Sequence, residues 1–359
     1  MNNAGAIIYC EGAFGTPNGK TAHGLIRHTH RYHVLSVVDS QFSGQDAGMV
    51  VEGRTKNIPV WQDIPTAFDE ARAAGFHPTH LVIGLAPDGG RLDPKAREDV
   101  KKAIQLGLHI DSGLHDLLSE DSEITGLAET QKVVIRDIRK TPPRDALHFF
   151  CGKIEEVTSF KIAVLGTDSA IGKRTTAGIL VEALRNAGHT AEIIGTGQTA
   201  WMQGAEYCII LDSLINDFVA GEIEHVIYRA WKEKNPDFII IEGQGSLMNP
   251  AYPGGFEILA AGRPDGIILQ HAPARKEYDG FPGYLLHPIE KQIKAIELLS
   301  GKPVVAITIN HEHLDTSTIS QICSKIEEEC GIPTCDVLLE DAHKLVTLLL
   351  ALKERKMNG

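Results

Sequence analysis

The sequence predicts an α/β protein of two domains, each built on a parallel β-sheet. Short apolar runs alternate along the chain with longer amphipathic runs, which is typical of βαβ units. At 359 residues the chain is too long for one small core. Thr141-Pro142-Pro143 follows an apolar run and indicates a linker. We therefore expect a Rossmann-like domain over residues 1–150 and a second α/β domain over residues 151–359.

The first domain is expected to begin with a strand at residues 6–9, a glycine-rich loop, and a helix from Thr21. Gly75 and Gly107 end two further predicted helices, at residues 64–74 and 94–106. The glycine spacing of the first loop does not match the dinucleotide fingerprint. Asp39 follows the second strand, where a Rossmann enzyme has its ribose-binding acid, but one aspartate does not establish such a site. The predicted strands are residues 6–9, 34–38, 59–61, 80–85 and 108–110.

The loops that follow these strands carry a candidate substrate site. Loops at the carboxyl ends of parallel strands line the ligand crevice. Here they bring one cation, small residues and hydrogen-bond donors, which suits a small anionic ligand. Ordinary helix-capping turns explain the same residues equally well. The candidates are Lys20, Ser112, Gly113 and His115.

The second domain is organised around a glycine-bounded loop that ends in a lysine. An apolar strand at residues 162–165 precedes the loop, and a helix at residues 175–185 follows it. Glycines let successive N–H groups converge on an anion, and the helix N-terminus and Lys173 add positive charge. The pattern predicts a phosphate cradle. The candidate cofactor-binding residues are Gly166, Thr167, Asp168, Ser169, Ala170, Ile171, Gly172, Lys173, Arg174, Thr175 and Thr176.

The spacing of this loop departs from that of the common P-loop. Five residues rather than four separate Gly166 from Gly172-Lys173, and Arg174 replaces the Ser or Thr that normally binds Mg²⁺. The loop resembles that of dethiobiotin synthetase and related P-loop proteins. Arg174 favours a diphosphate held without metal, while Thr175 leaves Mg²⁺-ATP as an alternative.

Polar groups also follow the other strands predicted in the second domain. The strand at residues 237–241 ends in Glu242, which takes the place of a Walker B carboxylate beside the loop. Asn310 follows the strand at residues 304–309, and helices are expected at residues 316–330 and 341–355. Strands at residues 191–194, 208–211 and 266–270 lead to further candidates. These are Gln198, Asp212, His271 and Arg275, while Gln244 and Ser246 follow Glu242 after the strand at residues 237–241.

Composition excludes several classes of protein. The formal net charge of −12 argues against general nucleic-acid binding. No apolar run approaches the length of a membrane span, so we expect no membrane partner and a cytoplasmic location. The six cysteines form no CxxC pair and indicate reduced thiols. The histidines of residues 23–33 suit a solvated surface, so no metal site is predicted.

Together these motifs resemble a P-loop family of which one branch has been described as the DgcN-type D-glutamate N-acetyltransferases. The resemblance rests on residues 166–173, on Thr196-Gly197-Gln198-Thr199, and on residues 217–221, 242–247 and 271–275. Residues 20–22 and 112–115 extend it over nearly the whole chain. The segment from Gly12 to Lys20 and the histidine-rich stretch depart from that branch, which is consistent with a sister group that uses another acyl acceptor.

The resemblance implies transfer of an acetyl group from acetyl-CoA to the amine of D-glutamate or a similar amino acid, in a homo-oligomer. The candidate catalytic residues are Glu242, His271 and Asp212, with Glu242 as first choice of general base and His271 as second. Backbone N–H groups of residues 243–246 are candidate oxyanion donors. Lys20, Ser112, His115 and Arg275 are expected on the acceptor's carboxylates.

Two alternatives remain open at this stage. An ATP-dependent ligase would use Lys173, Thr175, Asp212 and Glu242 for ATP with Mg²⁺. A nucleotide-sensing protein would bind without chemistry.

Overall fold

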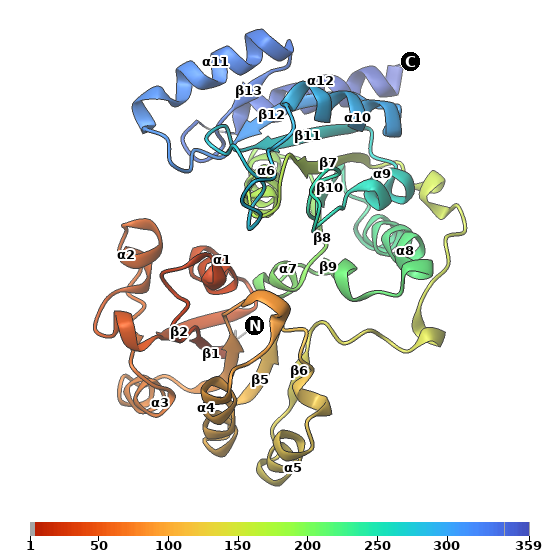
Figure 1. Ribbon diagram of the computed structural model, residues 1–359. Helices are drawn as coiled ribbons and strands as arrows, with labels where there is room; N and C mark the ends of the chain where they lie inside the picture. The colour runs from red at the N-terminus through yellow and green to blue at the C-terminus, as the bar shows by residue number, and fades with distance from the viewer. Residues whose placement is uncertain (1–3, 341, 359) are drawn as a thin grey trace. The chain divides into compact units, whose positions relative to one another are not determined.

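The computed structural model describes residues 4–340 and 342–358, and the chain folds into two compact units (Figure 1). The N-terminal unit runs to Thr141 and also includes Gln198–Ala205. The C-terminal unit comprises Pro142–Gly197 and the chain from Glu206 onward. Both are α/β units with parallel sheets, as the sequence predicts.

The described part of the N-terminal unit is built on a six-stranded sheet in the order β3-β2-β1-β4-β5-β6. Every neighbouring pair is parallel, so the loops after the strands gather at one edge. The order reverses at β1, because β2 lies on one side of it and β4 on the other. The strands are β1 Ala4–Tyr9, β2 Tyr32–Val38, β3 Val60–Trp61, β4 Pro78–Ile83, β5 His109–Ser112 and β6 Ile135–Asp137.

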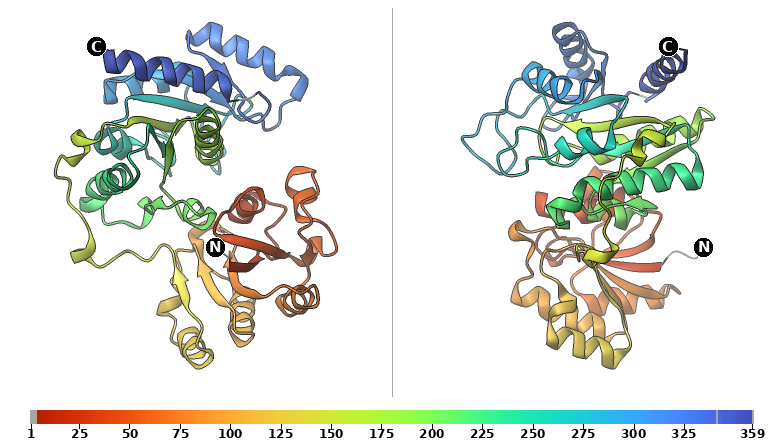
Figure 2. Two further views of the ribbon diagram at one scale, coloured as in Figure 1. Left: turned by 180° about the vertical axis from the view of Figure 1, so that it is seen from behind. Right: turned by 90° about the vertical axis from the view of Figure 1, so that its right-hand side faces the viewer.

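Helices cover both faces of this sheet. Helices α3, α4 and α5 lie in a row along one face, coloured orange to yellow in Figures 1 and 2, and α1 packs with α2 and α7 on the other. Buried apolar side chains of the strands and helices form one core. The helices are α1 Lys20–Arg27, α2 Ala47–Glu52, α3 Ile64–Ala73, α4 Pro94–Gln105, α5 Ser122–Gln131 and α7 Gln198–Gln203.

Helix α7 belongs to the N-terminal unit although it lies far along the chain. The side-chain amide of Gln203 donates to the carbonyls of Gly24 (2.8 Å) and His28 (3.0 Å). The Arg31 guanidinium lies 3.7 Å from the centre of the Trp201 ring, and Met202 is completely buried. The sequence predicts only a polar turn here, because six residues are too few for a helical period to stand out.

The described part of the C-terminal unit contains a seven-stranded parallel sheet in the order β13-β12-β11-β7-β10-β8-β9. The central strand β7 leads into the lysine loop, with β11 on one side and β10 on the other. Among the described residues, no helix has both the length and the apolar content that a bilayer span requires. The strands are β7 Phe160–Gly166, β8 Ala191–Gly195, β9 Tyr207–Cys208, β10 Phe238–Glu242, β11 Gly266–His271, β12 Val304–Ile309 and β13 Thr334–Cys335.

Two apolar cores flank this sheet. One joins the strands to α6 and α12, and the other joins them to α8, α9, α10 and α11. The central strands are therefore buried on both faces, which explains why they read as continuous apolar runs. The helices are α6 Lys173–Asn186, α8 Asn216–Lys234, α9 Phe256–Gly262, α10 Ile289–Ser300, α11 Ile319–Cys330 and α12 His343–Asn358.

The boundary between the units lies at Thr141/Pro142, within the predicted linker and ahead of the domain boundary expected at residue 150. Residues 142–150 belong to the C-terminal unit because they pack on α8. The Glu222 carboxylate accepts from the His148 backbone N–H at 2.7 Å, and that of Glu224 accepts from Cys151 and Ile154.

Candidate functional site

The lysine loop, residues 166–173, joins the end of β7 to the start of α6. We call it the phosphate loop. Helix α6 begins at Lys173 rather than at the predicted residue 175. Gly172 precedes it with a φ of 97°, a left-handed conformation that glycine adopts without steric cost. Ala170 also has a positive φ, of 50°, which costs free energy for a residue with a side chain. Surrounding contacts must hold this conformation.

The ammonium group of Lys173 lies inside the loop. Its Nζ donates to the backbone carbonyls of Asp168 and Gly245, both at 2.7 Å. Burial lowers the pKa of Lys173 to about 8, although the negative charges of Asp168 and Glu242 partly oppose that shift. Because these two hydrogen bonds go to neutral carbonyls, the buried ammonium keeps a positive charge that an anion can pair with.

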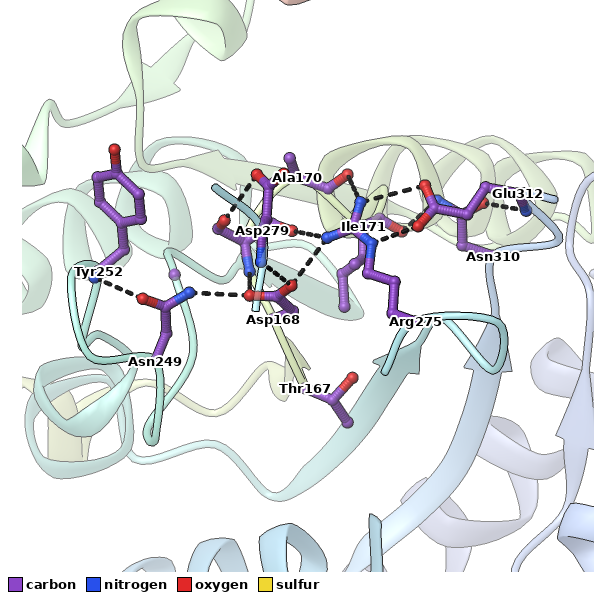
Figure 3. A network of polar contacts seen from close by, with 12 residues as sticks. Thr167, Asp168, Ala170, Ile171, Asn249, Tyr252, Arg275, Asp279, Asn310 and Glu312 are labelled. Carbon is purple, nitrogen blue, oxygen red and sulfur yellow. Dashed lines mark hydrogen bonds and ion pairs between the residues drawn. The ribbon is translucent and has the colours of Figure 1, made fainter. Parts of the chain in front are cut away.

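The side chain of Asp168 holds the loop from within (Figure 3). It is completely buried, and its carboxylate accepts the backbone N–H groups of Ser169 (2.7 Å) and Asp279 (2.9 Å). It also accepts from the Asn249 amide at 2.8 Å and from Arg275 Nη1 at 2.9 Å. The carboxylate thus ties the phosphate loop to the loops that follow β10 and β11.

Arg275, which the sequence predicts to bind substrate, contacts the phosphate loop. Its guanidinium donates to the carbonyls of Ser169 at 2.8 Å and Ala170 at 3.3 Å, besides pairing with Asp168 and Glu312. These bonds hold Ala170 in its left-handed conformation. The hydrogen bonds of Arg275 within the described residues therefore go to the phosphate loop and to Glu312, and its role on the acceptor's carboxylate stays a prediction.

Glu242 ends β10 inside the protein. Burial raises the pKa of this carboxyl above its ordinary value, while the nearby charges of Arg174 and Lys173 and the Thr196 N–H oppose that shift. The Thr196 N–H donates to Glu242 Oε2 at 3.1 Å, and the Gln244 amide donates to the Thr196 carbonyl at 2.6 Å. A carboxyl with a raised pKa is a better proton acceptor than an ordinary glutamate, and Glu242 therefore suits proton transfer.

His271 ends β11 on the other side of the phosphate loop. Burial lowers the pKa of its imidazole to about 4, so the ring is neutral near pH 7. Nδ1 lies 3.0 Å from the Thr167 hydroxyl. One residue before it, Gln270 Oε1 accepts the Thr176 hydroxyl at 2.5 Å. His271 therefore packs against the base of the loop and is the poorer candidate for a general base.

The segment after Glu242 is folded tightly beside the loop. Gly245 has a φ of 48°, and a Cβ there would lie 1.9 Å from the Tyr252 carbonyl oxygen, so only glycine fits. The N–H groups of Gly243 and Ser246 donate to the carbonyls of Val164 (3.0 Å) and Tyr252 (3.2 Å). These two of the predicted oxyanion donors are therefore already engaged. The buried Ser246 hydroxyl has no hydrogen-bond partner among the described residues.

The remaining predicted residues fall elsewhere. In the N-terminal unit, Lys20 and His115 are exposed, while Ser112 is buried and its hydroxyl accepts the Leu114 N–H at 3.3 Å. Gln198, expected at the cofactor, belongs to this unit and packs on Gly113. Asp212 is exposed in the turn after β9, in the C-terminal unit. Lys20, Ser112, Gly113 and His115 stay predictions for the acceptor.

Several residues that hold the site have no clear sequence signal. Asn249, Asp279 and Glu312 all hold the loop or its clamp Arg275, but each lies in an irregular segment with no recognisable spacing. Asn310 does not extend toward a ligand. Its amide donates to the Ile171 carbonyl at 3.1 Å and accepts the Glu312 N–H at 3.0 Å. Asp39 likewise makes hydrogen bonds within the protein, accepting the N–H groups of Gln41 in its own loop and of Phe14 in the loop after β1.

Comparison with known families matches both units. Residues 40–141 match the Rossmann-like domain of unknown function DUF1611_N, and residues 148–346 match the P-loop domain DUF1611_C. The chain belongs to the DUF1611 family. A crystal structure of a family member from Anabaena variabilis ATCC 29413 superposes with a TM-score of 0.89 at 27% identity, covering 97% of this chain and all of the other.

Two curated relatives carry the name D-glutamate N-acetyltransferase. One, from Tritonibacter scottomollicae, is 29% identical over 79% of this chain and 84% of its own. The other, from a Pseudoalteromonas species, is 31% identical over 75% of this chain and 80% of its own. With relatives of this coverage, the DUF1611 protein described here is an enzyme of the acyltransferase class.

Proposed function

We propose that this DUF1611 protein transfers the acetyl group of acetyl-CoA to the amine of D-glutamate or a closely related acidic amino acid. The observation that carries the proposal is the buried Lys173 ammonium, which lies inside a rigid loop and close enough to Glu242 for their charges to interact. The names of the two relatives support the same reaction and acceptor.

The phosphate loop suits the diphosphate of coenzyme A. Lys173 and the N-terminus of α6 provide positive charge at the loop, and Arg174 lies close enough to affect the pKa of Glu242. No serine or threonine follows the lysine directly. Lys173, Arg174 and the helix N-terminus neutralise a diphosphate through direct contacts, and Asp168 and Arg275 hold the loop around it.

Glu242 is the proposed general base. Acetyl-CoA supplies an activated acetyl group as a thioester, and the attacking amine must be unprotonated to react with it. Glu242 accepts the amine's proton, and its raised pKa makes it a stronger base than an exposed glutamate. The Thr196 N–H, by donating to Oε2, fixes the orientation of the carboxylate.

A direct assay tests the proposed function. The protein is incubated with acetyl-CoA and separate D- and L-amino acids, and products are identified by mass spectrometry. We expect N-acetyl-D-glutamate, or the product of a similar acidic amino acid, together with free CoA. A parallel incubation replaces acetyl-CoA with Mg²⁺-ATP. Release of phosphate in that arm, without acetylated product in the first, would replace the acetyltransferase with an ATP-dependent ligase.

The pH profile of kcat/KM should be bell-shaped. Activity rises with pH as Glu242 loses its proton, at a pKa above the ordinary 4.5. It falls as pH passes about 8, where Lys173 of the free enzyme becomes neutral and loses its attraction for phosphate. Lys173→Arg should remove the alkaline limb, because a guanidinium stays charged throughout this range. An alkaline limb that is identical in both proteins would rule out Lys173 as its source.

A further inference from the structure

An exposed aromatic and apolar surface lies beside the phosphate loop. It consists of Tyr252, Phe281, Tyr284 and Leu285, and we call it the aromatic patch. The side chains of Tyr252, Tyr284 and Leu285 are 54%, 59% and 71% exposed. The ring centres of Tyr252 and Phe281 are 6.2 Å apart, and those of Phe281 and Tyr284 are 6.4 Å apart, so the three rings form a continuous surface. Exposed groups of this kind mark binding sites.

Both loops that carry the patch are fixed to the phosphate loop. The Tyr252 N–H donates to Asn249 Oδ1 at 2.8 Å, and the Asn249 amide donates to Asp168. The Asp279 N–H donates to the same carboxylate, two residues before Phe281. In Figure 3 the Tyr252 ring points away from this network. Within the loop after β11, the Tyr278 N–H donates to the Tyr284 carbonyl at 2.9 Å.

The sheet order places most of the patch across the phosphate loop from Glu242. Strand β7 lies between β10, which ends at Glu242, and β11, whose following loop carries Phe281, Tyr284 and Leu285. A diphosphate bound in the loop carries two substituents, which extend from it in different directions. If the reacting end reaches Glu242, the other substituent is directed toward β11 and the patch.

We infer that the aromatic patch is an adenine site, which binds the purine ring of the same molecule whose diphosphate occupies the phosphate loop. A purine is flat and apolar on both faces and stacks on tyrosine and phenylalanine. The inference builds on the proposed diphosphate site, but it names adenine, which CoA and ATP share.

The test is isothermal titration calorimetry of the full-length protein with ADP, CoA, 4′-phosphopantetheine and inorganic pyrophosphate. The variant is Tyr252→Ala combined with Phe281→Ala. Both residues hold their loops through backbone N–H groups, so the loops keep their anchors. We expect Kd for ADP and CoA to rise roughly tenfold, the effect typical of losing a base-stacking ring. Kd for pyrophosphate and 4′-phosphopantetheine should not change. Leu298→Ala, on α10 and 86% exposed, is the matched control.

The other possible results of the titration each contradict one of the two proposals. Equal weakening of pyrophosphate and ADP would mean that the patch only supports the loop, and unchanged ADP binding would mean that the ring does not bind there. Either result overturns the adenine site, as does a wild-type protein that binds neither ADP nor CoA. A wild-type protein that binds ADP but not CoA would instead refute the acetyl-CoA proposal and leave the adenine site standing.

Discussion

Glu242→Gln should reduce kcat by about 10²- to 10⁴-fold, the usual contribution of a general base. Glutamine has the same shape and its Oε1 still accepts the Thr196 N–H, so the site should keep its geometry. It cannot accept the proton of the attacking amine. Steady-state kinetics with acetyl-CoA and D-glutamate measure the loss, and calorimetry with CoA should show an unchanged Kd.

Two further variants make this result specific. Glu182→Gln changes a glutamate on α6 whose side chain is 57% exposed, and it should behave as wild type. His271→Gln should lower kcat far less than Glu242→Gln, since a neutral imidazole with a pKa of about 4 is a weak base. Full turnover in Glu242→Gln, or a larger loss in His271→Gln, would transfer the role of base to another group.

Arg275→Ala should lower the free energy of unfolding by about 3 kcal/mol, near the lower end for breaking a buried ion pair. The variant removes the guanidinium that pairs with the completely buried Asp168 carboxylate, which would keep its N–H donors from Ser169, Asn249 and Asp279. It also removes the hydrogen bond to the Ala170 carbonyl that helps to hold this residue at its positive φ. Urea denaturation measures the free energy of unfolding. A weaker affinity for CoA would show that the phosphate loop has lost its conformation.

Arg263→Ala is the comparison for this variant. Arg263 pairs with Glu155 at 2.6 Å, but both side chains are more than half exposed. Such a surface pair contributes less than about 1 kcal/mol. If Arg275→Ala costs no more than Arg263→Ala and CoA affinity is unchanged, then Arg275 does not hold the loop, and its predicted role at the substrate returns to consideration.

The sequence predicts the parallel sheets and the phosphate loop well, because both leave local patterns. Strands buried on both faces are unbroken apolar runs, and Gly166, Gly172 and Lys173 have the spacing that an anion cradle needs. The clamp on this loop leaves no such pattern. Asp168 and Arg275 lie more than a hundred residues apart and meet only after β7 and β11 pair. Sequence alone therefore suggested a substrate contact for Arg275.

Helix α8 is not predicted from the sequence, because a packing contact requires a glycine within it. Its 19 residues include Gly221, which weakens a helical pattern, so the sequence around it indicates a family motif and no helix. The structure explains the glycine. A Cβ at residue 221 would lie 2.0 Å from the His148 carbonyl oxygen, so glycine lets residues 148–149 cross the helix. A contact with a distant segment cannot be read from the helix itself.

The inclusion of α7 in the N-terminal unit has a consequence for how the protein can be divided. The chain passes from one unit to the other at residues 141/142, 197/198 and 205/206. A protease that cuts the linker at residue 141 would therefore release no separate fragment from the folded protein. A gene truncated to start at residue 142 would encode a product whose Trp201 and Met202 have lost the sheet that covers them. Expressed apart, neither half would contain all the segments of the N-terminal unit.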